Sequence, residues 1–162
     1  MVFPFADDYT FGVLQSDAHW QWFTARCSTL KGDYRYTSST VFDSSPWPQA
    51  PTGAQAEAVA GSGRALRAVR RRVMAEHGLS LRALYQMLDG LPGADPLADA
   101  HAALDAAVRA AYAMPAAADP LAFPLAFNVR LAAAEAEGGA VVGPGPSPSV
   151  ADALVSADAV GT

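Results

Sequence analysis

Cap and stop signals after Pro51 divide most of this 162-residue chain into helices. Thr52, followed three residues later by Gln55, forms a capping box, in which each side chain satisfies a backbone N–H at the start of a helix. Gly78 is placed to end that helix near residue 77, because glycine adopts the left-handed conformation of a C-terminal cap. The pattern therefore predicts a helix over about residues 52–77.

Three further helices follow from the same kind of signal. Ser80, Asp95 and Asp119 are each placed to cap one helix, while Gly90 and Gly138 end the first and the last of them. Side chains at helical spacing form a stripe that we expect to be buried in each of the helices capped by Ser80 and Asp95. The stripe of the first contains Leu81, Leu84, Tyr85 and Leu88. The stripe of the second contains Leu97, His101, Leu104, Val108 and Tyr112. The high alanine content favours helix throughout.

Local features modify two of these helices. Gly61 and Gly63 weaken the helix predicted over residues 52–77 by about 1 kcal/mol each relative to alanine, and predict a kink or a break near Ser62. Asp105 and Arg109 are placed for a favourable i,i+4 ion pair on the helix that Asp95 caps.

The first 51 residues have a different character. Residues 1–8 form at best an edge strand, and Phe11–Leu30 reads as helical with a break at residues 15–17. Residues 34–42 are rich in Tyr, Thr and Val and predict extended chain, whereas three prolines make residues 44–51 irregular. The predicted fold is mainly α: a small irregular or β-containing N-terminal part, about four helices and a disordered tail.

Three regions follow from this reading: residues 1–51, residues 52–140 and residues 141–162. The last is rich in Gly, Pro and Ser, then in Ala, Val and Asp, without helical periodicity, so we expect it to be disordered.

Charge is distributed unevenly along the chain. The net charge is −5, yet residues 1–72 carry eight Lys and Arg against six acids, so their net charge is +2 and that of the remainder is −7. The chain has one cysteine, no signal peptide and no apolar run near eighteen residues, so we expect a soluble cytoplasmic protein. The negative average does not exclude a nucleic-acid partner for the N-terminal half.

Catalytic and metal-binding patterns are absent from the sequence. No histidine has a second ligand three or four residues away, which disfavours a zinc site, and no catalytic triad can be assembled. Gly61-Ser62-Gly63 lies in a helical context without a preceding strand, so it does not predict a cofactor loop. We therefore assign no catalytic, cofactor-binding or metal-binding residue.

The stretch from Tyr9 to Pro51 carries a specific order of motifs. F-G-V-L-Q-S begins at Phe11, a helix containing His and Trp follows, R-Y-T begins at Arg35, and an aromatic-proline segment ends the stretch. This order resembles the end of the target-recognition domain of the large DNA methyltransferases of restriction-modification systems, the MmeI-type enzymes. The runs that begin at Met74, Asp99 and Asp119 resemble the helical C-terminal domain of the same family, so the resemblance covers nearly all of residues 2–146.

The resemblance implies an adenine-specific, S-adenosylmethionine-dependent DNA methyltransferase, often fused to or partnered with a nuclease. Its catalytic domain precedes the region that this chain resembles. The chain has neither a glycine-rich loop for S-adenosylmethionine nor the N/D/S-P-P-aromatic motif that holds a flipped base. We therefore expect a fragment that lacks the catalytic core, binds no cofactor and is inactive alone. Its expected partners are double-stranded DNA and a catalytic methyltransferase domain or chain.

Cations interleaved with aromatic residues mark the candidate DNA-binding site. Such a combination lets cations reach phosphates or base edges while flat rings stack or pack. The candidates are Arg26, Lys31, Tyr34, Arg35 and Tyr36. Secondary candidates for contact with phosphate or a protein partner are Arg64, Arg67 and Arg71, which share the outer, solvated face predicted for the first long helix.

Two alternatives remain open at this stage. In the first alternative to a DNA-recognition fragment, the chain is a stand-alone helical module that binds an acidic protein through the arginine-rich helix. In the second, it is a non-functional gene remnant. The second alternative rests on departures from the family pattern that loosen packing, at Ser44-Ser45, Gly61, Gly63 and Pro124.

Overall fold

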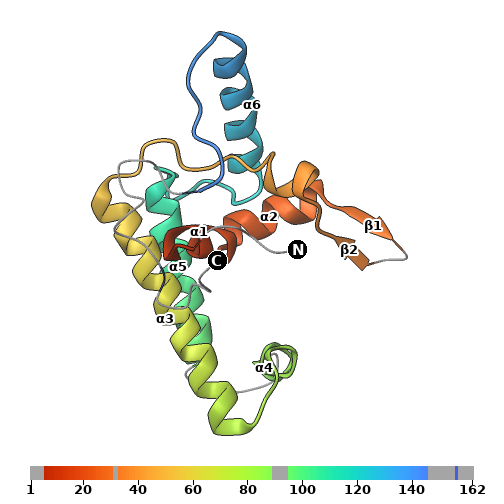
Figure 1. The fold of residues 1–162 in the computed structure, drawn as a ribbon, viewed down its shortest axis with the longest axis vertical. Helices are drawn as coiled ribbons and strands as arrows, with labels where there is room; N and C mark the ends of the chain where they lie inside the picture. The colour runs from red at the N-terminus through yellow and green to blue at the C-terminus, as the bar shows by residue number, and fades with distance from the viewer. Residues whose placement is uncertain (1–5, 31–32, 89–94, 146–155, 157–162) are drawn as a thin grey trace.

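The computed structural model describes residues 6–30, 33–88, 95–145 and 156. Figure 1 shows a mainly helical protein with one small hairpin, which confirms the fold class predicted from the sequence. Its elements are α1 (Asp8–Leu14), α2 (Asp17–Arg26), β1 (Ser28–Leu30), β2 (Asp33–Arg35), the π-helix η1 (Ser38–Phe42), α3 (Gly53–His77), α4 (Leu81–Leu88), α5 (Pro96–Ala111) and α6 (Ala122–Ala136).

The core lies where α1 and α5 pack against the long helix α3. Apolar side chains of all three helices are fully buried there, each stabilising the fold by roughly 1.5–3 kcal/mol relative to an exposed position. The buried set includes Tyr9, Val13, Val59, Leu66, Leu104 and Val108. Helix α3 is therefore covered on two of its faces.

Two glycines allow α1 to cross α3 at close range. A Cβ atom on Gly63 would lie 3.2 Å from the Asp8 carbonyl oxygen and 3.4 Å from the Gly12 Cα. The break predicted near Ser62 is wrong, because α3 runs unbroken from Gly53 to His77. The helix-weakening effect of Gly63 is offset by the packing of α1 that its missing side chain permits.

Most of the caps predicted for the helices after residue 51 are present, and Gly90 lies outside the described residues. Thr52 and Gln55 form the capping box of α3, and Gly78 closes the helix with φ of 62°. Asp95 caps α5 by accepting hydrogen bonds from the N–H groups of Leu97 and Ala98.

Helix α6 begins later than its sequence signal predicts. The Asp119 carboxylate accepts hydrogen bonds from the N–H groups of Leu121 and Ala122, but the helix starts at Ala122. Pro124 then lies in the first turn, where a missing N–H breaks no intrahelical hydrogen bond. The proline is therefore compatible with the helix.

The apolar stripes are only partly buried. Leu97, Leu104 and Val108 of α5 and Tyr112 at its C-cap are buried as predicted, whereas His101 of the same stripe is only half-buried. In α4, Leu84 is buried, but Leu81 and Tyr85 are exposed, which corrects the predicted buried face of that helix; the side chain of Leu88 lies outside the described residues. The correction follows from the position of α4, which Figure 1 shows at the end of α3 and away from the core.

The predicted ion pair between Asp105 and Arg109 is not formed. The Asp105 carboxylate instead accepts a hydrogen bond from the Asp17 N–H at 2.8 Å, which links α5 to the start of α2. The Arg109 guanidinium donates to the carbonyl oxygens of Pro115, Ala116 and Ala118, and so holds the loop that follows α5. Asp105 thus has a tertiary partner, whereas Arg109 has partners in the loop that directly follows its own helix.

The N-terminal part is divided differently from its prediction. The break at residues 15–17 is confirmed, since Ser16 caps α2 by accepting a hydrogen bond from the His19 N–H. Residues 28–30, expected to be helical, are strand β1, and residues 38–42, expected to be extended, are the π-helix η1. Residues 34 and 35 are extended as predicted, and residues 44–51 are irregular as predicted.

Residues 141–145 contain no helix or strand, but Gln49 holds them. Its side-chain amide donates to the Val142 carbonyl oxygen at 3.0 Å and accepts from the Val142 N–H at 2.8 Å. Residues 146–155 and 157–162 of the predicted disordered tail, and residues 1–5 of the predicted edge strand, lie outside the described residues. None of the helices in the described ranges combines the length and hydropathy needed to cross a membrane.

Candidate functional site

The two strands β1 and β2 form a short antiparallel hairpin that projects from the body of the protein (Figure 1). Ser28 pairs with Arg35, and Thr29 pairs with Tyr34. Arg35 and Tyr34 therefore each lie opposite a small hydroxyl residue of β1. Because successive side chains of a strand point to opposite faces, Tyr34 and Arg35 lie on opposite faces of the hairpin.

Helix α2 and the hairpin share an aromatic cluster, composed of Trp20, Phe23, Tyr34 and Tyr36. The ring centroid of Phe23 lies 5.4 Å from Trp20, 5.7 Å from Tyr34 and 5.3 Å from Tyr36. Trp20 and Tyr34 remain 52% and 56% exposed. Large exposed aromatic side chains that adjoin one another are typical of a binding surface.

Two of the predicted cations, Arg26 and Arg35, lie on α2 and β2. Arg26, in the last turn of α2, is exposed and places its guanidinium 5.4 Å from the Trp22 ring centroid. Arg35 is exposed, and its side chain has no partner within the described residues. Lys31 lies outside the described residues. Arg26, Tyr34, Arg35 and Tyr36 thus lie on or directly after α2 and β2, at the end of the protein that carries the hairpin.

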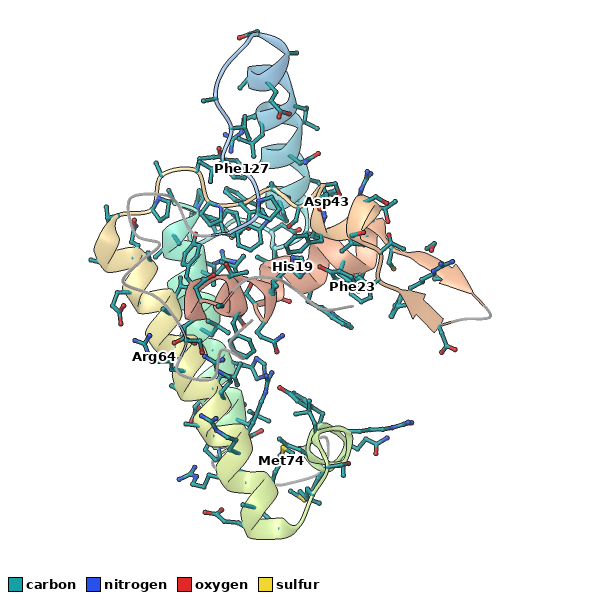
Figure 2. All side chains as sticks on the ribbon, in the orientation of Figure 1. His19, Phe23, Asp43, Arg64, Met74 and Phe127 are labelled. Carbon is teal, nitrogen blue, oxygen red and sulfur yellow. The ribbon has the colours of Figure 1, made fainter. Side chains whose placement is uncertain are left out.

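A buried histidine ties the hairpin to the body. Figure 2 shows His19 and Phe23 along α2, the helix that precedes the hairpin. The His19 Nε2 lies 2.9 Å from the Tyr36 hydroxyl oxygen, and its Nδ1 lies 3.4 Å from the Ser45 hydroxyl oxygen. Burial lowers the pKa of His19 to about 4, so its imidazole is neutral at pH 7. Burial and the nearby Asp43 carboxylate raise the pKa of Tyr36 to about 12.

This role of His19 was not predicted from the sequence. Helical spacing places His19 and Phe23 on one side of α2, and that spacing is the signal that could have indicated it. The partners Tyr36 and Ser45 are 17 and 26 residues away, and no local pattern connects them.

The arginine stripe of α3 mainly serves the fold. Arg64 forms an ion pair with Asp8 at 3.1 Å and a second with Glu57. Arg67 pairs with the same Asp8 carboxylate, which is 1% exposed, and lies 4.4 Å from the centroid of the Phe11 ring. The prediction of a solvated outer face is therefore wrong for Arg67, whose side chain is 19% exposed beneath α1. Arg71 is exposed.

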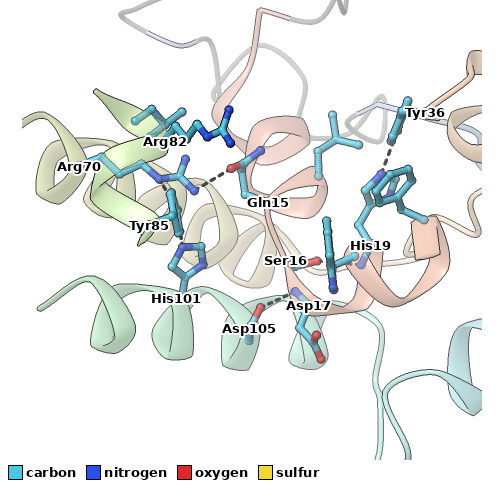
Figure 3. Close-up of a pocket in the computed structure, with 14 residues that line it drawn as sticks. Gln15, Ser16, Asp17, His19, Tyr36, Arg70, Arg82, Tyr85, His101 and Asp105 are labelled. Carbon is cyan, nitrogen blue, oxygen red and sulfur yellow. Dashed lines mark hydrogen bonds between the residues drawn. The ribbon is translucent and has the colours of Figure 1, made fainter. Parts of the chain in front are cut away.

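A groove of about 900 Å³ lies between α2, α4 and α5 (Figure 3). Its lining includes Trp20 and Phe23 of the aromatic cluster and Arg82 of α4. On its α4 side, Arg70 donates a hydrogen bond from Nε to the Tyr85 hydroxyl oxygen at 2.8 Å, and that oxygen lies 2.7 Å from the Nε2 of His101. Burial and the Arg70 guanidinium lower the pKa of His101, while Asp95 opposes this shift.

The remaining chemical candidates have structural roles. Trp47 is buried against Phe42, and the Tyr112 hydroxyl donates to the Pro46 carbonyl oxygen at 2.6 Å. The irregular segment of residues 44–51 is therefore packed against the rest of the protein. Cys27 is a partly buried free thiol. Within the described ranges, no three His, Cys, Asp or Glu side chains are grouped so that they could hold a metal ion.

Comparison with known proteins first shows what the N-terminal part, which carries the hairpin, is similar to. Residues 1–49, which include α1, α2 and the hairpin, match the family model of the MmeI target recognition domain. This match contains all five of the predicted DNA-binding candidates. No curated protein matches the chain.

One solved structure then extends the likeness beyond residue 49. It is the type IIL restriction-modification enzyme MmeI in complex with DNA, similar to this protein with a TM-score of 0.68 and 26% sequence identity. The similarity covers 79% of this chain and 17% of MmeI, so this chain spans about a sixth of the length of that enzyme. The resemblance to MmeI-type restriction-modification enzymes is therefore confirmed, both for the recognition end and for part of the helical region.

Proposed function

We propose that this protein recognises double-stranded DNA for restriction-modification, with the hairpin as its reading element. Residues 1–51 act as the end of a target-recognition domain, and residues 52–140 act as the helical C-terminal domain that supports it. The methyl transfer that this recognition serves is adenine-specific and uses S-adenosylmethionine. It is carried out by a catalytic methyltransferase domain or chain distinct from these 162 residues, which contain no cofactor loop or base-holding motif.

The observation that carries this proposal is the projecting hairpin with an exposed tyrosine and an exposed arginine. The major groove of B-DNA, about 12 Å wide, admits a two-stranded β-ribbon, and arginine is the commonest side chain that reads guanine there. The hairpin has the required shape, and Arg35 is not engaged by the described part of the chain. The match of this segment to a target recognition domain supports the same use.

The charge distribution also supports this assignment. Residues 1–72 are positive overall, but Arg64 and Arg67 are used in pairs with Asp8. The cations of the hairpin end are therefore those best placed to replace the counterions of DNA phosphates. The same pairs weaken the alternative in which the arginine-rich helix binds an acidic protein.

Binding of a fluorescent duplex, followed by anisotropy between about 50 and 200 mM salt, tests the proposal. The wild-type chain is expected to bind with an affinity that falls steeply with salt. Arg35→Gln should weaken binding and reduce the slope of log K against log salt by up to about 0.9, the contribution of one phosphate contact. If Arg35 reads a base instead, binding to specific sequences should weaken while the slope is retained.

Arg130→Gln is the matched control, since Arg130 is an exposed arginine on α6, which Figure 1 shows well apart from the tip of the hairpin. It should leave both affinity and slope unchanged. A folded wild-type chain that does not bind duplex DNA, or an Arg35→Gln variant indistinguishable from Arg130→Gln on every sequence, would refute the proposed role of the hairpin.

A further inference from the structure

We propose that the groove between α2 and α4 is a second contact with the same DNA, in which Arg82 binds a backbone phosphate. The inference rests on the proposed function, and assigns a DNA-binding role to α4, a helix outside residues 1–49. The occupant of the groove is the phosphodiester backbone of the duplex that receives the hairpin.

The groove is continuous with the aromatic cluster that α2 shares with the hairpin. Trp20 and Phe23 belong to the aromatic cluster and also line the groove, so one surface leads into the other without an intervening element. Figure 1 shows the hairpin and α4 on the same side of α3. A duplex held by the hairpin would therefore extend along a surface that α4 borders.

Charge indicates what the groove can hold. Arg82 is exposed on its rim, and its guanidinium has no partner within the described residues. The neighbouring Arg70, in contrast, is engaged by the Gln15 side chain at 2.8 Å and by Tyr85. Arg82 is thus the arginine of this groove that is available to an anion, and its planar fork suits a phosphate.

The acidic groups of the groove already have partners. The Asp105 carboxylate accepts from the Asp17 N–H, and the Asp17 carboxylate accepts from the Gln21 side chain at 3.0 Å. Burial raises the pKa of Asp105, and the hydrogen bond from Asp17 opposes that shift. Both carboxylates belong to α5 and to the start of α2, whereas Arg82 extends from α4 on the opposite wall (Figure 3).

The wall that carries Arg82 is held in place. Leu84 of α4 is fully buried, and Tyr85 is fixed by Arg70 of α3 and His101 of α5. Because α4 is anchored at two successive residues, the adjoining Arg82 backbone is positioned before DNA arrives. This reduces the ordering cost of the contact to that of one side chain.

The salt series described above, repeated with Arg82→Gln in the full chain, tests this inference. The variant should lose about 0.9 of the salt slope. Over a fourfold increase in salt, the wild-type affinity should therefore fall about 3.5-fold more than that of the variant. Arg82→Lys, which keeps a charge at this position, should retain the wild-type slope, and Arg130→Gln should again have no effect. Circular dichroism of each variant shows whether it is folded.

The outcomes separate this inference from the function on which it rests. If Arg35→Gln weakens binding but a folded Arg82→Gln variant keeps the full slope, the hairpin binds DNA and the groove does not. If the folded wild-type chain shows no salt-dependent binding, both proposals are wrong. If Arg82→Lys loses as much slope as Arg82→Gln, charge at this position is not the cause and the phosphate contact is refuted.

Discussion

His19 joins three segments that are separate in the sequence. Its backbone belongs to α2, its Nε2 meets Tyr36 just after β2, and its Nδ1 faces Ser45 in the irregular segment before α3. Only 5% of its surface is exposed, so protonation would place a charge in a site that cannot solvate it. The neutral imidazole is thus a condition for the position of the hairpin.

The lowered pKa of His19 predicts a specific loss of stability in weak acid. In the unfolded chain the histidine takes up a proton near pH 6.5, whereas in the folded protein its pKa is about 4. The stabilisation is therefore complete above pH 6.5 and is lost as the pH falls towards 4. Between pH 7 and pH 5 the wild type should lose about 2 kcal/mol through this residue.

Urea unfolding of the wild type and of His19→Gln at both pH values measures this loss. The variant keeps an amide that can hydrogen-bond but removes the titration, so its stability should change less by about the same 2 kcal/mol. His101 titrates in both proteins, so its contribution cancels. Equal pH dependence of the two proteins would show that His19 is not the responsible group.

Close approach of helices is the main structural device at the level of elements. Helix α1 crosses α3 at Gly12 and Gly63, and the buried Asp8 carboxylate of α1 is paired with Arg64 and Arg67 of α3. A carboxylate buried in this way is tolerated because two guanidinium groups pair with it and offset the loss of its hydration. The crossing positions α1, and α1 leads directly into α2 and the hairpin.

Substitution of two helical glycines by alanine should have opposite effects. A Cβ on Gly12 would lie 2.7 Å from the Val59 Cγ1 and 2.9 Å from the Val59 carbonyl oxygen, so α1 must shift away from α3. Gly12→Ala should destabilise the protein by about 1–2 kcal/mol despite its gain in helix propensity. At Gly61 the nearest atom is the tip of Arg64 at 3.7 Å, so Gly61→Ala should stabilise by up to about 1 kcal/mol.

Urea denaturation of both variants checks this difference. A stabilising Gly12→Ala substitution would mean that α1 does not approach α3 as closely as the structure has it. The result for Gly61→Ala shows the size of the propensity effect where no packing opposes it.

The whole molecule consists of a packed body and several projecting parts. The body is formed by α1, α3 and α5, whereas the hairpin, α4 and α6 extend from it (Figure 1). Among the described residues of α6, Pro124 is the one that is buried, while Leu121, Leu125 and Val129 are exposed. The stability of the protein should therefore be unevenly distributed.

Hydrogen exchange followed by mass spectrometry should reveal this distribution. Backbone amides of α6 should exchange at least about tenfold faster than those of α3 and α5 after correction for intrinsic rates, which corresponds to about 1.4 kcal/mol less opening free energy. Few buried apolar contacts oppose the local opening of α6. Equal protection of α6 and α3 would show that the protein opens as a single unit.

Local chemistry alone determined where α3 begins and ends, where α5 begins, and which aromatic and cationic residues are candidates for DNA binding. Thr52, Asp95 and Gly78 act on backbone groups within a few residues, so their effects can be predicted from neighbouring positions. The aromatic and cationic residues around Tyr34 are close in sequence as well as in space. The order of these residues also carried the resemblance to MmeI-type enzymes, which the comparisons with known proteins confirm.

Only the tertiary structure decided the partners of charged and buried groups. Arg64 and Arg67 meet an aspartate more than fifty residues away, residues 28–30 leave their predicted helix to pair with β2, and Asp105 leaves Arg109 for the start of α2. The groove beside Arg82 likewise requires three helices to come together. Such contacts depend on how distant segments pack, and a pattern with a range of three or four residues does not contain that information.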